Sequence, residues 1–167
     1  CLEITTTRDI ARQILRHRSF SFQEFSQRYA NPDKELAGAF VTREARLQDP
    51  KNRQNSIEIE SDPNIQLNAS QQELVTDWQR RQHSVTNAAK VAYEWAIENG
   101  IAKEQARAVL PEGMTVSRMY MNGTLRSWAH FISLRSGNGT QKECMEVAKA
   151  SAKVLEPIFP MIIDFVK

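Results

Sequence analysis

The sequence contains no long apolar run. Its longest apolar stretch, residues 157–166, is interrupted by Pro160 and Asp164 and is shorter than the ~20 residues that a membrane-spanning helix needs. The first residues also lack the pattern of a secretory signal. These two absences argue against a membrane protein or a secreted one and favour a cytoplasmic location.

Cysteine is scarce. The chain has two, Cys1 and Cys144, which lie far apart and show no metal-ligand spacing. A disulfide scaffold is therefore disfavoured, and the composition is typical of the reducing cytoplasm. We expect both thiols to be free and packed, with a functional pair as the alternative, and we expect no metal site.

Neither sign of charge dominates. The net charge is +2 over 167 residues, which by itself does not indicate nucleic-acid binding. With 41% hydrophobic and 25% charged residues, residues 1–167 are interpreted as a single globular domain. The positive charge is uneven, however, with five arginines against two acidic residues between Arg8 and Arg28. A basic helical module that binds nucleic-acid phosphates is therefore an alternative interpretation.

Residue patterns predict an α+β fold dominated by helices. Leu2 and Ile4 alternate with polar residues as in a strand, and Thr7 is placed to cap a helix that continues to about Arg18. One face of that helix is apolar. Another face carries a row of arginines spaced four apart: Arg8, Arg12 and Arg16.

The longest predicted element is a helix over residues 70–99. Ser70, with Glu73 three residues later, has the pattern of a capping box at its start. Trp78 and Trp95 fall on its apolar side and are predicted to be core residues.

The other segments are shorter. Before the long helix, the patterns predict an ordered loop over residues 19–29, a strand over 40–47 and a long surface connection over 49–68. Met119 and Met121 are predicted to lie in a buried strand. After the long helix we expect a short helix over residues 103–110, a strand over 115–121, and helices over 124–134 and 140–155.

Residues 16–29, RHRSFSFQEFSQRY, are dense in polar groups, with three arginines, a histidine, a glutamate and three serines. Guanidinium groups bind phosphate bidentately, and hydroxyl groups add further donors. We interpret the segment as an anion site, with a solvated helix face and an arginine-rich loop as the alternative. A nucleophilic role for Ser26 is disfavoured because no histidine–carboxylate relay is recognisable around it.

This segment resembles the signature of the flavin-dependent thymidylate synthases, RHRxxSxNExSxRY. Eight of its nine fixed positions agree, and Gln23 stands where that family usually has asparagine. Two further blocks resemble the family in the same order: residues 106–111, ARAVLP, and residues 125–135, LRSWAHFISLR. The similarity covers nearly the whole chain, most weakly through residues 49–68, and implies the helix-rich α+β fold of that family.

The resemblance implies methylation of dUMP to dTMP, with methylene-tetrahydrofolate as one-carbon donor and FAD, reduced by NADPH, as hydride source. It also implies a homotetramer with shared active sites. Family members carry a further N-terminal portion, so we expect this chain to be truncated at its N-terminus, with Cys1 either a truncation point or a processed junction. A fragment that has lost catalysis but still binds nucleotide or flavin is therefore a second alternative.

Carried over by position, the resemblance implies one catalytic residue, Arg135. A fixed cation beside the uracil carbonyl favours the anionic ring and raises electron density at C5, whereas an arginine pairing with the helix dipole is the alternative. Arg28, Arg107 and Ser26 would hold the phosphate, and Gln13 with Arg135 the uracil edge. The full set implied for dUMP is Gln13, Arg16, Glu24, Ser26, Gln27, Arg28, Arg107 and Arg135.

The resemblance also implies contacts with FAD. Without the motif, His17 would be interpreted as a hydrogen-bonded packing histidine, whereas within the motif we expect it to position the flavin. Tyr29 is expected to move or stack at the substrate pocket. The full set implied for FAD is Arg16, His17, Arg18, Glu24, Thr124, Arg126 and His130.

Overall fold

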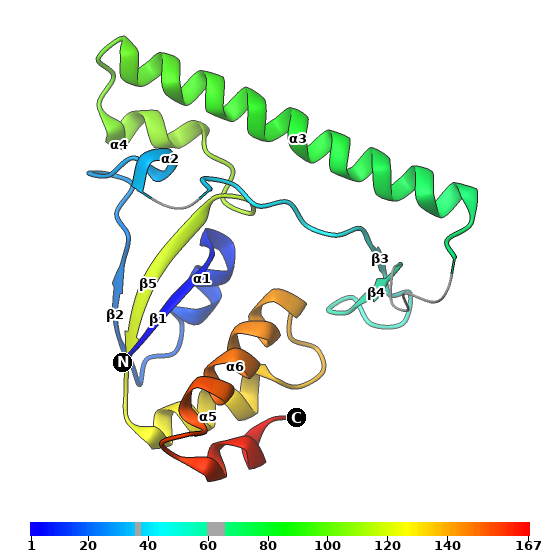
Figure 1. Cartoon of the computed structure of the whole chain (residues 1–167), viewed down its shortest axis with the longest axis vertical. Helices are drawn as coiled ribbons and strands as arrows, with labels where there is room; N and C mark the ends of the chain where they lie inside the picture. Colours follow the sequence, from blue (N-terminus) through cyan, green and yellow to red (C-terminus); the bar gives the residue numbers. More distant parts are fainter. Residues whose placement is uncertain (36–37, 60–65) are drawn as a thin grey trace. The chain divides into compact units, whose positions relative to one another are not determined.

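A computed structural model describes residues 1–35, 38–59 and 66–167 (Figure 1). The chain divides into two compact units, one formed by Cys1–Phe25 with Ser117–Lys167 and the other by Ser26–Val116. Each unit has its own hydrophobic cluster. That residues 1–167 form a single domain stays a prediction. Within the described ranges, no helix combines the length and the apolarity needed to cross a membrane.

The first unit is built on a three-stranded sheet with the order β1-β5-β2. β2 runs antiparallel to β5 and places Phe22 opposite Met121. Side chains alternate between the two faces of a strand, so Met119 and Met121 are fully buried as predicted, whereas Tyr120 between them is exposed. The three strands are β1 (Leu2–Thr7), β2 (Ser21–Glu24) and β5 (Val116–Asn122).

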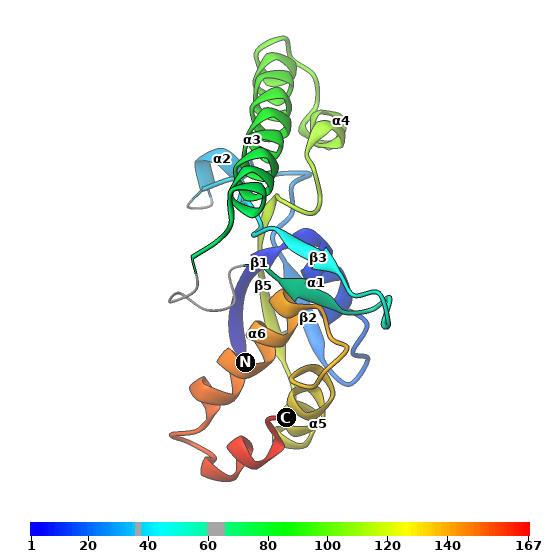
Figure 2. The same ribbon diagram turned by 90° about the vertical axis from the view of Figure 1, so that its right-hand side faces the viewer.

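Helix α6 connects the helices of the first unit to its sheet. It contacts α1 and β1 as well as α5 and the C-terminal 3-10 helix η2, and Figure 2 shows α6 next to β1 and α5. The C-terminal part of the chain therefore packs against its N-terminal strand and helix. The bounds are α1 (Arg8–Ile14), α5 (Leu125–Arg135), α6 (Lys142–Leu155) and η2 (Pro160–Phe165).

An aromatic cluster forms the centre of this core. Trp128 is 1% exposed and lies edge-on to Phe20 and Phe131, with ring centroids 4.9 Å and 5.9 Å away. Gly123, in the turn between β5 and α5, permits this packing because a Cβ there would lie 2.5 Å from a ring carbon of Phe20. The cluster thereby fixes the start of α5 against the segment that precedes β2.

The second unit is organised around the long helix α3. Its C-terminal half contacts α4 and η1, where Tyr93, Ala96 and Ala106 form a small buried cluster. Strands β3 and β4 pair as an antiparallel hairpin. The bounds are α2 (Pro32–Glu35), β3 (Arg46–Gln48), β4 (Ser56–Glu58), α3 (Ala69–Glu98), α4 (Lys103–Ala106) and η1 (Arg107–Val109).

The start of α3 corrects one prediction. The N-cap is Asn68, not Ser70: the Asn68 side chain accepts from the Gln71 N–H at 2.9 Å, and the Gln71 side chain accepts from the Asn68 N–H at 3.1 Å. These two bonds complete a capping box. The sequence thus offers two such boxes two residues apart, and since asparagine caps as well as serine, the pattern alone does not choose between them.

The buried face of α3 corrects a second prediction. Trp78 and Trp95 are 41% and 60% exposed, so their placement in the core is wrong. Gln82 is buried because its amide holds both backbone groups of Arg43, accepting from the N–H at 2.7 Å and donating to the carbonyl at 2.9 Å. A polar contact with a connecting segment therefore selects the covered side of the helix, which apolar periodicity does not reveal.

The first helix is shorter than predicted. α1 ends at Ile14 instead of Arg18, and the chain continues in a tight turn in which the His17 N–H donates to the Ile14 carbonyl. Arg16 therefore lies beyond the helix, and the predicted row of three arginines is interrupted. Thr7 is the N-cap as predicted, although its side chain makes no capping hydrogen bond to the first turn of α1 and its hydroxyl donates to the Asp9 carboxylate.

Two loop predictions also change. The ordered loop expected over residues 19–29 contains β2, and the strand expected over residues 40–47 is reduced to a bridge between Phe40 and Thr115 and to the later β3. The connection expected over residues 49–68 contains β4, while residues 60–65 lie outside the described residues.

The C-terminal elements agree with prediction to within a few residues at their ends. Both cysteines are free, as expected, but only Cys144 is buried, and Cys1 is exposed.

Candidate active site

The first unit brings Arg135 and His17 into direct contact. Arg135 is the last residue of α5, and its Nε donates a hydrogen bond of 2.9 Å to Nε2 of His17 in the turn after α1. The His17 ring also lies edge-on to Phe131, with ring centroids 4.9 Å apart. This bond uses one of the five N–H donors of the guanidinium, so the terminal nitrogens are oriented while their donors are not consumed by His17.

His17 is held neutral by its surroundings. Its pKa is lowered from 6.5 to about 4, first because burial disfavours the charged ring and then because of electrostatic interactions with Arg135 and His130. A neutral ring with its proton on Nδ1 leaves Nε2 as an acceptor, which the bond from Arg135 requires.

Folding stability should therefore fall as the pH is lowered from about 6.5 towards about 4. Between these pH values His17 takes up a proton in the unfolded chain but not in the folded one. The free energy of unfolding therefore decreases by up to about 1.4 kcal/mol for each pH unit. We expect chemical denaturation to show that the free energy of unfolding decreases more between pH 7 and pH 5 in the natural protein than in His17→Gln. That variant keeps an acceptor but does not titrate, and equal losses in the two proteins would contradict the assignment.

Glu24 lies at the end of β2 and has two partners. Its Oε1 accepts from the Ser117 hydroxyl at 2.7 Å and from Nη1 of Arg8 at 3.5 Å. Ser117 is 1% exposed, so its hydroxyl is fixed within the sheet. One carboxylate oxygen is thus held from β5 and α1, which orients the group that the resemblance implies for both dUMP and FAD.

The remaining predicted residues near α1 differ in their surroundings. Gln13 donates from Nε2 to Oε1 of Gln141 at 2.7 Å, which ties α1 to the residue that caps α6. Arg16 and Arg18 are exposed in the turn after α1. Their guanidinium groups are accessible to an anion.

A groove in the first unit contains two of the residues predicted to contact FAD. Arg126 and His130, one helical turn apart on α5, line a cavity of about 520 Å³. Thr124 caps the same helix, its hydroxyl oxygen accepting from the Ser127 N–H at 3.2 Å. Aromatic walls with a cation and an imidazole suit a flat ring that carries a phosphate tail. The other lining residues are Leu125, Ala129, Ser133, Phe159 and Phe165.

In the second unit, a turn carries three of the predicted nucleotide contacts, Ser26, Gln27 and Arg28. The Ser26 carbonyl accepts from the N–H groups of Tyr29 and Ala30 at 3.2 and 3.1 Å. The Nζ of Lys103 donates to the Tyr29 carbonyl at 2.8 Å and ties the turn to α4.

Arg28 and Arg107 converge on a residue that the sequence interpretation did not include. Arg28 Nε donates to Oε2 of Glu104 at 2.9 Å, and Arg107 Nε donates to the Glu104 backbone carbonyl at 3.3 Å. The Arg28 guanidinium also lies 5.4 Å from the centroid of the exposed Tyr29 ring. Two cations implied for the phosphate thus share one anchor within a single unit.

Gln27 carries an unsatisfied donor. It is 3% exposed, and its Nε2 has no hydrogen-bond partner in the parts of the chain that the structure describes. A buried amide without a partner costs about 1–3 kcal/mol. An acceptor on a bound ligand would remove this cost, which fits the nucleotide contact that the resemblance implies for Gln27.

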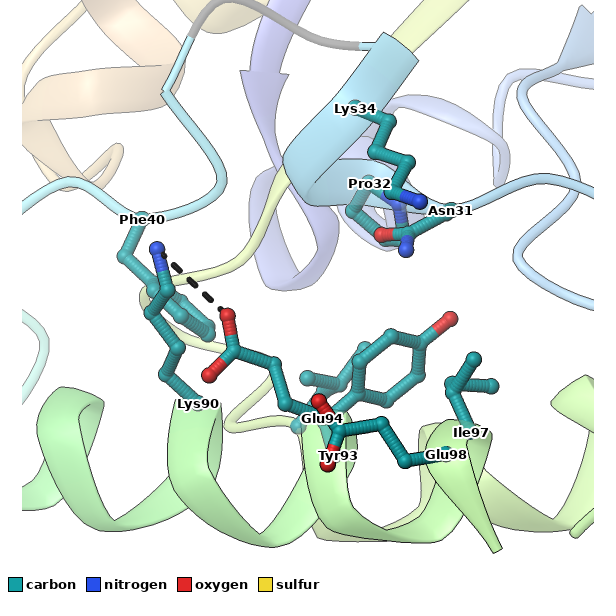
Figure 3. Close-up of a pocket in the computed structure, with 10 residues that line it drawn as sticks. Asn31, Pro32, Lys34, Phe40, Lys90, Tyr93, Glu94, Ile97 and Glu98 are labelled. Carbon is teal, nitrogen blue, oxygen red and sulfur yellow. Dashed lines mark ion pairs between the residues drawn. The ribbon is translucent and has the colours of Figure 1, made fainter. Parts of the chain in front are cut away.

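A smaller cavity in the second unit involves none of the predicted site residues. It measures about 190 Å³ and lies between the C-terminal half of α3 and the segment around α2 (Figure 3). Lys90 and Glu94 form an ion pair of 3.9 Å across its wall.

The predicted site residues therefore form one cluster in each unit. The first contains His17, Arg135, Glu24 and the groove on α5, and the second contains the turn at Ser26 with Arg107. Sequence reasoning missed Ser117 and Glu104, which hold predicted residues in place. Both lie outside the recognisable signature. The one signal for Glu104 in the sequence is its spacing, three positions before Arg107 on a helical segment.

Comparison with known proteins identifies the family. A family model described as thymidylate synthase complementing protein matches residues 1–161. A flavin-dependent thymidylate synthase from Synechocystis sp. is 46% identical over 162 residues, which is 96% of this chain and 67% of that protein. A probable flavin-dependent thymidylate synthase of Paramecium bursaria Chlorella virus 1 is 42% identical over 161 residues, covering 96% of this chain and 68% of that protein.

Solved structures agree with this match. A UMP/dUMP methylase, PolB from Streptomyces cacaoi, bound with 5-Br UMP, is similar with a TM-score of 0.75 and 25% identity, over 98% of this chain and 70% of that chain. The same methylase bound with 5-Br dUMP gives a TM-score of 0.74. The chain therefore belongs to the family of thymidylate synthase complementing proteins, the flavin-dependent thymidylate synthases. The predicted family and its α+β fold are confirmed, as is the prediction of an enzyme of that family.

Proposed function

We propose that the protein carrying this chain methylates dUMP to dTMP, with methylene-tetrahydrofolate as one-carbon donor and FAD, reduced by NADPH, as hydride source. The observation that carries the proposal is the family match over residues 1–161. It is supported by the name of the Synechocystis sp. relative and by the nucleotide analogues bound to the Streptomyces cacaoi methylase.

Arg135 is proposed to activate the uracil ring. Its Nε is engaged by His17, which supports a fixed orientation of the terminal nitrogens. A positioned cation in a partly buried site stabilises negative charge that develops on the uracil carbonyl and N3, and this raises the electron density at C5. Gln13 is proposed to address the uracil edge together with Arg135.

The phosphate is proposed to bind at Arg28, Arg107 and Ser26. Two guanidinium groups anchored on one residue present several donors to phosphate oxygens, and the Ser26 hydroxyl adds another. Gln27 is proposed to complete the pocket, because its buried Nε2 has no acceptor among the described residues. Arg16 and Glu24 complete the set proposed around dUMP.

FAD is proposed to contact residues from both segments of the first unit. The cavity on α5 supports this proposal through its apolar walls and its charged rim. When bound, the flavin supplies the hydride chemistry, and the protein contributes binding, orientation and exclusion of water. The proposed contacts are Arg16, His17, Arg18, Glu24, Thr124, Arg126 and His130.

A homotetramer with shared active sites belongs to the same proposal. Light scattering of the natural protein should give four times the mass of one chain. A fully active monomer would contradict the shared sites.

Genetic complementation tests the proposed function directly. The natural gene should allow a thymidine-requiring host to grow without thymidine, whereas the same gene with Arg135→Gln should not. Growth of neither strain, despite soluble and folded protein, would reject the proposal.

Replacing Arg28 by alanine should weaken dUMP binding by about 10- to 100-fold, because a charge-assisted hydrogen bond contributes about 1.5–3 kcal/mol. Equilibrium titration of the natural protein and the variant measures the change. Arg53→Ala is the matched control, since Arg53 is an exposed arginine of the same unit in the β3–β4 hairpin. Equal weakening in both variants would indicate a general charge effect and contradict a specific phosphate contact.

A further inference from the structure

The Glu104 carboxylate accepts from Nε of Arg28 at a distance that a phosphate oxygen would also adopt. The contact is 2.9 Å from Nε to Oε2, which is the length of a charge-assisted hydrogen bond. A carboxylate and a phosphate offer the same kind of anionic acceptor to a guanidinium. If Arg28 binds the nucleotide phosphate bidentately along the edge of the guanidinium that includes Nε, the phosphate and the Glu104 carboxylate compete for that donor.

We propose that Glu104 is a placeholder for the nucleotide phosphate: its carboxylate holds Arg28 in the absence of substrate and is displaced when dUMP binds. The inference rests on the proposed function for the role of Arg28. It adds a specificity-determining residue that lies outside the family signature.

Because the Arg28–Glu104 ion pair is exposed to solvent, replacing the carboxylate by a phosphate costs little free energy. The side chains of Arg28 and Glu104 are 55% and 44% exposed, so their attraction is screened by water and worth little. A phosphate monoester carries nearly two negative charges at neutral pH and three acceptor oxygens, against one charge and two oxygens on the carboxylate. A nucleotide therefore displaces Glu104, whereas an uncharged nucleoside offers nothing in exchange.

The backbone of Glu104 has a separate task from its side chain. Its carbonyl accepts from Nε of Arg107 at 3.3 Å, and this bond does not require the carboxylate. Lys103 independently ties the turn to α4 through the Tyr29 carbonyl at 2.8 Å. The carboxylate can therefore leave Arg28 while Arg107 and the turn keep their anchors, and a change confined to the side chain tests the placeholder alone.

The test is the affinity of the natural protein and of Glu104→Gln for dUMP and for deoxyuridine, measured by equilibrium titration. The variant should bind dUMP about two- to fivefold more tightly, the factor expected when a weak exposed ion pair no longer competes. Its affinity for deoxyuridine, which has no phosphate, should stay unchanged. Glu73→Gln, which removes an exposed carboxylate from the first turns of α3, is the matched control and should change neither affinity.

A second variant shows whether the effect passes through Arg28. In an Arg28→Ala background, Glu104→Gln should no longer tighten dUMP binding, because the competed donor is gone. The placeholder is refuted if Glu104→Gln weakens dUMP binding, leaves it unchanged, or tightens deoxyuridine binding equally. If the natural protein itself does not bind dUMP, the proposed function fails and the placeholder fails with it, an outcome distinct from the other three.

Discussion

Replacing Arg135 by glutamine is expected to lower kcat for dTMP formation by about 10²- to 10³-fold, the loss typical when one preorganised donor to a developing oxyanion is removed. Glutamine keeps a hydrogen-bond donor but has no positive charge to favour the anionic ring. The structure supports a large effect because His17 holds Nε of Arg135 at 2.9 Å, so the orientation of the cation is set before substrate binds.

Steady-state kinetics with dUMP as the varied substrate measures this change. Flavin absorbance of the purified variant is the control, since an unchanged flavin content excludes loss of cofactor as the cause. Arg135→Lys should recover only part of the activity, because one ammonium group cannot bond His17 and present a guanidinium fork at once. Retention of kcat within tenfold in Arg135→Gln would refute the proposed role of Arg135.

Replacing Trp128 by alanine is expected to lower the free energy of unfolding by about 3–5 kcal/mol. The ring is 1% exposed and packs edge-on against Phe20 and Phe131, so its removal leaves a cavity in the centre of the first unit. Phe20 belongs to the signature segment, and the loss should therefore also loosen the turn that carries His17.

Chemical denaturation of the natural protein and the variants measures the loss. Trp95→Ala is the matched control, since Trp95 is 60% exposed and should cost about 1 kcal/mol or less. Trp128→Phe, which keeps an aromatic ring, provides a milder change if the alanine variant does not fold. A loss at Trp95 as large as that at Trp128 would contradict the difference in burial.

The sequence predicted those helices and strands that are specified by their own residues, through a capping residue or an apolar periodicity. The helix predicted over residues 124–134 corresponds to α5, and the hydroxyl of Thr124 at its start accepts from the Ser127 N–H. β2 was missed because its four residues acquire their structure from pairing with β5, a contact between segments far apart in the chain. The burial of Trp78 and Trp95 was misjudged for a related reason: periodicity defines a face, but the neighbouring segments decide which face is covered.

In the candidate site, too, local sequence was informative and contacts between distant segments were not predicted. The family resemblance named the residues that the proposed function uses, but gave no account of what fixes them. That Ser117 would hold Glu24, that Glu104 would hold Arg28, and that His17 would accept from Arg135 are contacts between distant positions. Such contacts depend on tertiary packing and leave no periodic trace in a single sequence.

The early end of α1 has a consequence for the alternative of a nucleic-acid-binding module. Duplex DNA is a long polyanion with evenly repeated charge, and a helix that follows it needs cations at a matching repeat. α1 supplies a single interval, from Arg8 to Arg12, and Arg8 is engaged by Glu24. Arg16 and Arg18 continue in a turn, where they cannot extend that spacing. Cations grouped in this irregular way suit a compact ligand with few charges better than a polymer.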